Sequence, residues 1–305
     1  MSDKITQLRA RLMHGVAPAL ATPLQKDGYT VNTAVTHQLI DFLAARKTTG
    51  VLIGGTTGEG IMLSLTERKR LHEAGIAACK AQNRPYISLT HVGTNTVKDT
   101  IDLTQHAIEH STDAILVLCP YFLKLTDNDL FAYFRHISQI AGDTPMMVYD
   151  IPHLAINGIS PALLTRLETL PNFAGIKCSG RDGQIIRALI HALPEGKIFL
   201  AGNEKIALGT LAMGAHGMIS GLSTAIPEPF VDLCQAVGRG DLAAAQIAHA
   251  QINTILTMYD APHRIGSIKH LLEERGVPVG KPIPPRAAVT TSYWPAIANY
   301  LQITD

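Results

Sequence analysis

The chain has 305 residues and a mass of 32.8 kDa. Hydrophobic residues make up 46% of it and charged residues 17%, with a net charge of +1, a balance that supports a large core and excludes a disordered chain. The nearly neutral charge gives no reason to expect a nucleic acid or a membrane as partner. The length exceeds the usual domain of ~150 residues but suits one α/β barrel with additions, so we expect one large catalytic domain.

Eight short apolar runs are predicted as strands, and each is followed by a segment with helical periodicity. Most of the runs contain almost only apolar side chains, as parallel strands buried on both faces do. Eight such units favour an α/β fold of the (β/α)8 TIM barrel type, although a doubly wound open sheet has the same local alternation. The absence of a GxGxxG motif after the first run favours the barrel. The predicted strands cover residues 15–22, 50–54, 86–92, 114–118, 145–149, 173–177, 197–201 and 217–220.

Helix starts follow several of the predicted strands. Ser64 with Glu67 has the spacing of a capping box, and weaker versions of the pattern begin at Thr96 and Thr126. After residue 226 we expect no further strand but four helices and one proline-rich connection. We therefore divide the chain into a barrel of residues 1–226 and a C-terminal helical extension of residues 227–305. The four helices are predicted over residues 227–237, 241–259, 263–276 and 287–302.

The cysteines and the first residues bear on the compartment. The four cysteines form neither a CxxC pair nor a zinc-finger spacing, which fits reduced thiols. The first 15 residues lack the apolar stretch of a secretory signal, and no apolar run reaches the ~18 residues of a membrane span. We therefore expect a cytoplasmic protein. The cysteines are Cys79, Cys119, Cys178 and Cys234.

Lys177 ends the sixth predicted strand, directly after an apolar run. Functional residues of such a barrel come from the carboxyl ends of the strands and the loops that follow. Burial there would favour the neutral amine of Lys177, which can attack a ketone and form a Schiff base. The alternative is a structural lysine whose ammonium group reaches solvent or pairs with a carboxylate.

Two further strand ends carry groups that suit this chemistry. Tyr149 ends the fifth predicted strand, and its phenol can donate and accept the protons that imine formation requires. Residues 54–60 form a glycine-rich turn, in which backbone amides and the hydroxyls of Thr56 and Thr57 can hold a carboxylate. The turn lacks the GK[ST] ending of a Walker loop. Either feature can also be structural, the tyrosine as packing and the glycines as a simple turn.

In combination, these features resemble a known family. GTTGE after the second strand, YxxP after the fifth and GIK at the sixth resemble the signature of the N-acetylneuraminate lyase and dihydrodipicolinate synthase superfamily of Schiff-base aldolases. The resemblance covers residues 15 to 283 approximately. It implies a barrel with C-terminal helices, usually a homotetramer, that cleaves or condenses pyruvate with an aldehyde or dehydrates 2-keto-3-deoxy sugar acids. It implies no cofactor and no metal.

The resemblance also assigns roles to residues. Lys177 is expected to form the imine, Tyr149 to transfer protons and Thr56 to hold the tyrosine in its relay. A second set is expected to bind substrate, either at the carboxylate of the 2-oxo acid or at the rest of the molecule. That set comprises Thr57, Gly55, Gly58, Ile219, Ser179 and Glu204.

Three positions depart from the relatives. Leu154 stands where dihydrodipicolinate synthases carry an arginine for their second substrate, and Phe122 replaces the tyrosine that completes their relay. The acidic pair of sialic acid lyases corresponds here to Glu204 and Lys205. We therefore expect a 2-keto-3-deoxy sugar acid or a related hydroxy-2-oxo acid as substrate, with the two named activities as alternatives. Its recognition is expected from Asp150, His153, Asn203, Glu204, Lys205 and residues 220–223.

Two rival hypotheses remain. His91, His153 and His216 lie at or near strand ends and could together bind the divalent ion of a metal-dependent aldolase, although no HxxxH spacing occurs among them. Alternatively, the chain is a non-catalytic regulator that binds a 2-oxo acid as an imine without turnover, because Phe122 removes one hydroxyl of the relay.

Overall fold

Seven parallel strands form one curled sheet at the centre of the computed structural model, which describes residues 3–260 and 262–303. The strands lie side by side in chain order, each parallel to the next. Every strand residue is buried, as the nearly continuous apolar runs predict. The strands are β1 (Gly50–Ile53), β2 (Ile87–His91), β3 (Ala114–Leu118), β4 (Met146–Asp150), β5 (Phe173–Cys178), β6 (Ile198–Ala201) and β7 (Gly217–Met218).

The first predicted strand, residues 15–22, is not a regular strand. It makes two isolated bridges instead, from Val16 to Met218 of β7 and from Ala19 to Leu52 of β1. Pro18 has no N–H group to donate, so no continuous ladder runs along this segment. The described chain therefore has seven regular strands where eight were expected, and residues 15–22 hydrogen-bond to both outer strands of the sheet.

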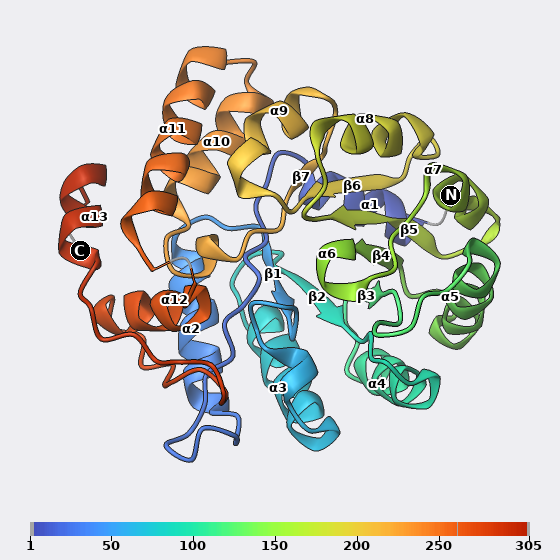
Figure 1. Cartoon of the computed structure of the whole chain (residues 1–305), viewed down its shortest axis with the longest axis horizontal. Coiled ribbons are helices and arrows are strands. Elements are labelled where there is room, and N and C mark those ends of the chain that lie inside the picture. Colours follow the sequence, from blue (N-terminus) through green and yellow to red (C-terminus); the bar gives the residue numbers. More distant parts are fainter. Residues whose placement is uncertain (1–2, 261, 304–305) are drawn as a thin grey trace.

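Helices follow most of the strands and cover the outer face of the sheet (Figure 1). Their caps agree with the sequence, since the hydroxyls of Ser64, Thr96 and Thr126 each accept a backbone N–H three residues later. The reciprocal capping box forms at Thr126, whereas the Glu67 carboxylate accepts the backbone N–H of Val31. The helices are α1 (Asp3–Leu12), α2 (Thr33–Ala45), α3 (Leu65–Lys80), α4 (Val97–Glu109), α5 (Asp127–Ala141), α6 (Pro152–Ala155), α7 (Pro161–Arg166), α8 (Gly183–Ala192) and α9 (Ala207–Ala212).

Two apolar clusters divide the side chains of the strands. Outward residues such as Ile53 and Ile176 pack against the surrounding helices, whereas inward residues such as Leu52 and Tyr149 meet inside the curl. This division follows from the alternation of side chains along a strand. Helix α1, which the sequence reading did not anticipate, buries Ile5, Leu8 and Leu12 in the inner cluster.

The four C-terminal helices lie on one side of the molecule, in orange to red in Figure 1. Helices α10 and α11 pack closely together, and buried residues of α11 and α12 belong to the same cluster as the outer core of the sheet. No helix in the described ranges is long and apolar enough to cross a membrane. The four are α10 (Glu228–Gly238), α11 (Leu242–Met258), α12 (Arg264–Glu274) and α13 (Trp294–Leu301).

Candidate active site

Lys177 and Tyr149 lie side by side on neighbouring strands. They are register partners on β5 and β4, with only 4% and 2% of their surface exposed. The Nζ atom of Lys177 lies 4.0 Å from the centroid of the Tyr149 ring. The hydroxyl of Thr56, in the turn after β1, lies 3.2 Å from the phenol oxygen of Tyr149. Three segments that are distant in the sequence thus bring the three expected catalytic residues together.

A cavity of about 440 Å³ opens above this group at the carboxyl ends of the strands. Of the residues expected to bind substrate, it exposes Thr57, Ser179, Glu204 and Ile219. Gly55 and Gly58 are not among its lining residues. A Cβ on Gly58 would lie 2.6 Å from the carbonyl oxygen of Leu20, so this glycine allows the turn to pack closely. The lining also includes His153, Leu154, Gly180, Asn203, Lys205, Gly221, Leu256 and Arg264.

The turn after β1 is anchored by Glu59, a residue of the GTTGE motif to which the sequence reading assigned no role. Glu59 has a left-handed backbone conformation and a fully buried carboxylate. One carboxylate oxygen lies 3.1 Å from Nζ of Lys269 on α12, and the other accepts the backbone N–H of Ile283 at 3.0 Å. The C-terminal extension therefore holds the turn that carries Thr56 and Thr57.

Asp150 does not line the cavity, contrary to the sequence-based expectation. Its side chain is fully buried and accepts two hydrogen bonds from Arg181, at 2.8 and 3.0 Å, and one from the backbone of Ile159. Ser220 is also fully buried, and its hydroxyl donates to Glu204. Both side chains are therefore structural, because their polar atoms are already engaged inside the protein.

Glu204 reaches the cavity but is already bound to several donors. Its Oε1 atom accepts from Ser220 at 2.7 Å and from the backbone of Leu222 at 2.9 Å, and Nη2 of Arg264 lies within 2.8 Å of both oxygens. Burial acts to raise the pKa of Glu204, but the Arg264 charge and these hydrogen bonds outweigh it and lower the pKa. Arg264, on α12, is 60 positions away, and no local sequence signal relates it to this site.

The buried ring of His91 packs against the ring of Tyr149. Its ring meets the Tyr149 ring edge-on, with centroids 6.0 Å apart, and its Nδ1 lies 2.9 Å from Nη2 of Arg68. Burial, with the charges of Arg68 and Lys177, holds the pKa of His91 well below its usual value, so the imidazole is neutral. Burial also lowers the pKa of Arg68 to about 10.

The three-histidine metal site of the rival hypothesis does not form. His153 lines the cavity, but Nδ1 of the buried His91 faces Arg68 and the carbonyl oxygen of Gly54. His216 precedes β7, at the opposite end of the sheet from the cavity, and accepts the backbone N–H of Phe199. Within the described ranges, these histidines do not gather into a group of metal-ligating atoms.

Phe122 and Leu154, which depart from the relatives, occupy different environments. Phe122 lies in the loop after β3 with 78% of its surface exposed and a φ of 79°, and it is not part of the cavity lining. Leu154 follows His153 on α6 and lines the cavity. An apolar side chain therefore faces the cavity at the position where the synthases carry an arginine.

Comparisons with known proteins identify relatives in sequence and neighbours in fold. Two curated relatives are each named 4-hydroxy-tetrahydrodipicolinate synthase. That of Listeria welshimeri is 30% identical over 87% of this chain and 89% of its own length, and that of Neisseria meningitidis serogroup B is 32% identical over 82% and 85%. Similar solved structures include the wild-type sialic acid aldolase of Ruminococcus gnavus, with a TM-score of 0.86, 24% identity and coverage of 96% of each chain.

A second solved structure is that of YagE, a prophage protein of E. coli K12 in complex with pyruvate. It has a TM-score of 0.85 and 28% identity, with coverage of 94% of this chain and 97% of that one. The family model for dihydrodipicolinate synthetases matches residues 12–304. The resemblance expected from the three motifs is confirmed: the chain belongs to the dihydrodipicolinate synthetase family.

Proposed function

We propose that the protein is a Schiff-base aldolase that forms an imine between Lys177 and pyruvate. The observation that carries the proposal is the contact of Lys177, Tyr149 and Thr56 beneath a cavity of about 440 Å³. A buried lysine beside a phenol that is itself held by a hydroxyl is the arrangement that imine chemistry needs. The pyruvate complex of YagE supports the choice of 2-oxo acid.

The reaction follows from these positions. The unprotonated amine of Lys177 attacks the keto carbon of pyruvate, and Tyr149 gives a proton to the oxygen as the carbinolamine forms and loses water. The iminium withdraws electrons, so the methyl carbon loses a proton to the phenoxide of Tyr149 and becomes a nucleophilic enamine. The enamine adds to the carbonyl carbon of an aldehyde, whose oxygen takes this proton from Tyr149, and hydrolysis of the new iminium returns the lysine. Cleavage is the same sequence reversed, with Thr56 holding the phenol in both directions.

The carboxylate of pyruvate is assigned to Thr57 and the backbone of Ile219. Both line the cavity beside Lys177. Gly221 is necessary to this corner, because a Cβ there would lie 2.5 Å from Oγ1 of Thr57. Gly55 and Gly58 are assigned to the shape of the turn rather than to the ligand.

The second substrate is assigned to a 2-keto-3-deoxy sugar acid or a related hydroxy-2-oxo acid. Polar groups of Ser179, Asn203, Lys205 and Arg264 line the cavity and suit hydroxyl and carboxylate groups. The reaction for which the curated relatives are named is disfavoured, because the apolar Leu154 lines the cavity at the position where the resemblance implies an arginine for the second substrate.

The assembly and the complete fold belong to the same proposal. Residues 15–22 take the place of the eighth strand and close a (β/α)8 barrel. The barrel ends near residue 226 and is followed by the C-terminal helical extension. The copies form a homotetramer in the cytoplasm. Four exposed apolar side chains lie in two segments that Asn157 ties together through hydrogen bonds to the carbonyl oxygens of Pro120 and Leu123, and we assign these side chains to a contact with a second copy. These side chains are Phe122, Leu123, Leu154 and Ile156, with 56–78% of their surface exposed.

Trapping the imine tests the proposal. Pyruvate with borohydride is expected to add one reduced adduct per chain, and peptide mass spectrometry should place it on Lys177. Lys177→Ala should abolish the adduct, whereas Lys205→Ala, which removes another lysine of the same cavity, should leave it unchanged. An adduct on Lys205, or none in the wild type, would contradict the mechanism.

A panel of 2-keto-3-deoxy acids and sialic acid, followed by pyruvate release, then identifies the second substrate. Pyruvate release from a 2-keto-3-deoxy acid is the expected result. Release from sialic acid alone would assign the activity named for the Ruminococcus gnavus structure instead. Adduct formation without turnover of any compound would favour the binding protein over the enzyme.

A further inference from the structure

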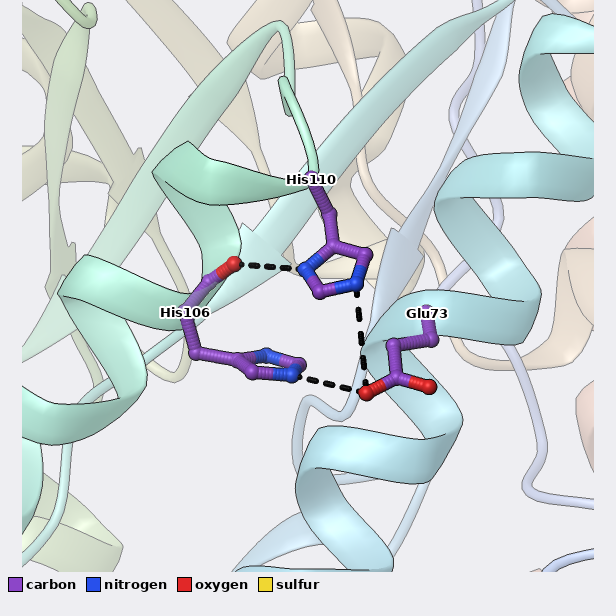
Figure 2. Close-up of side chains that lie close together, drawn as sticks. All are labelled: Glu73, His106 and His110. Atoms are coloured by element: carbon purple, nitrogen blue, oxygen red, sulfur yellow. Dashed lines mark hydrogen bonds and ion pairs between the residues drawn. The ribbon is translucent and has the colours of Figure 1, made fainter.

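Two histidines and one glutamate converge between α3 and α4, outside the cavity that contains Lys177 (Figure 2). His106 lies in the last turn of α4 and His110, four positions later, is its C-cap residue, so both point to the same side of the helix end, and Glu73 faces them from α3. Oε1 of Glu73 lies 2.9 Å from Nε2 of His106 and 3.9 Å from Nε2 of His110. The two imidazole rings are 4.4 Å apart between centroids.

These distances fit a first-row divalent metal. Bonds of about 2.0–2.1 Å in a tetrahedral site place neighbouring ligand atoms about 3.3 Å apart. The two measured separations lie on either side of that value, and the ligand atoms of all three residues lie within 4.8 Å of one another. Small side-chain rotations would therefore bring one atom from each residue onto a single ion. Two imidazoles with one carboxylate make a donor set that zinc uses in proteins.

The tautomer of His110 also suits a ligand. Its Nδ1 lies 3.0 Å from the backbone carbonyl oxygen of His106, and a carbonyl can only accept, so Nδ1 carries the proton. Nε2 is then the ring nitrogen of His110 that can serve as a ligand, and it is the one that faces Glu73. A hydrogen bond from the second ring nitrogen to a carbonyl is the usual support of a metal-binding histidine.

Access and charge allow an ion to enter. About half of the Glu73 side chain and 38% of the His110 side chain are exposed, whereas His106 is nearly buried at 11%. The neighbouring Lys69 is neutralised by Asp102 at 2.7 Å. Lys80 donates to the carbonyl of His110 and adds one positive charge nearby, so we expect micromolar rather than nanomolar affinity.

We propose that Glu73, His106 and His110 form a binding site for a divalent transition metal, with zinc as the ion that suits them best. The metal would replace the proton shared between Glu73 and His106 and would tie α3 to α4, and its fourth position would be open to water. The site does not depend on the proposed aldolase activity, since none of the three residues lines the active-site cavity.

The test is zinc binding to the full chain, without an affinity tag and after treatment with a chelator. Isothermal titration with zinc chloride is expected to show one saturable site per chain and a raised Tm. The four cysteines are buried and should not compete. Cobalt in place of zinc should give the visible absorption of a tetrahedral site.

Three variants and a control make the result decisive. His110→Ala and His106→Ala should each weaken zinc binding by at least about 100-fold, and Glu73→Gln by at least about tenfold. His136→Ala, an exposed histidine on α5, should change nothing. His110 is the more exposed of the pair, so His110→Ala remains informative if His106→Ala does not fold. Absence of zinc binding in the wild type, or an unchanged affinity in folded His110→Ala, would overturn the proposal.

Discussion

We expect the buried ion pair between Glu59 and Lys269 to connect the stability of the fold to the proposed binding of pyruvate. The two side chains are 0% and 1% exposed, and their charged atoms lie 3.1 Å apart. Removing one partner of a buried pair leaves the other charge without compensation, at a cost of about 3–5 kcal/mol. In Lys269→Met the Glu59 carboxylate keeps the N–H of Ile283 and the guanidinium of Arg286 at 3.5 Å, so we expect the lower end, about 3 kcal/mol. At about 2 °C per kcal/mol for a chain of this size, Tm should fall by about 6 °C.

A double-mutant cycle separates the interaction energy of Glu59 and Lys269 from the stability lost through poorer packing. Glu59→Gln with Lys269→Met removes both charges, while the glutamine oxygen can still accept the N–H of Ile283. The double variant should therefore be less destabilised than the sum of the single variants, by about 2 kcal/mol or more. As a control, Lys69→Met breaks an exposed ion pair of α3 and α4 and should cost no more than about 1 kcal/mol.

The same variants should change pyruvate binding. Glu59 follows Thr57 by two positions, so a loosened anchor should displace the hydroxyls of Thr56 and Thr57, which line the cavity. The pyruvate concentration for half-maximal borohydride trapping should rise in folded Lys269→Met and return toward the wild-type value in the double variant. Additive stability effects in the cycle, or an unchanged pyruvate dependence in Lys269→Met, would refute the reasoning.

Two further predictions concern the relay and the pH dependence of stability. Tyr149→Phe should slow imine formation by about 100-fold or more through loss of a general acid and base, and an unchanged trapping rate would remove Tyr149 from the relay. Because burial keeps the pKa of His91 well below its usual value in the folded state, only the unfolded chain takes up a proton near pH 6.5, so the free energy of unfolding falls as pH decreases. This histidine should contribute about 2 kcal/mol of that loss between pH 7 and pH 5, measured by urea unfolding. The loss should shrink by this amount in His91→Asn but not in His136→Asn, and equal losses in both variants would contradict the assignment.

Local sequence patterns predict several residues of the candidate site. Lys177 and Tyr149 end apolar runs that form parallel strands, and parallel strands place their carboxyl ends at one edge. The hydroxyls at Ser64 and Thr96 predict where helices begin, because capping depends only on residues three positions apart. The signal for His106 and His110 is local as well, an HxxxH spacing, but the sequence reading considered only histidines at strand ends and missed it.

Contacts between segments that are distant in the sequence determine which polar side chains of the site are engaged inside the protein. Asp150 was predicted to bind substrate, but its buried carboxylate pairs with Arg181 instead. No sequence spacing predicts this pair. Arg264 reaches Glu204 only because α12 packs against the cavity.

The sequence by itself determined the order of seven of the eight predicted strands, several helix caps and the lysine and tyrosine at the strand ends. These features depend on side-chain periodicity and on neighbours a few positions away. Only the tertiary structure decided which polar groups are free to meet a ligand. A polar group is free only if no opposite charge packs against it inside the protein. In this chain Glu59 pairs with Lys269 and Glu204 pairs with Arg264, and both cations lie on α12 of the C-terminal extension.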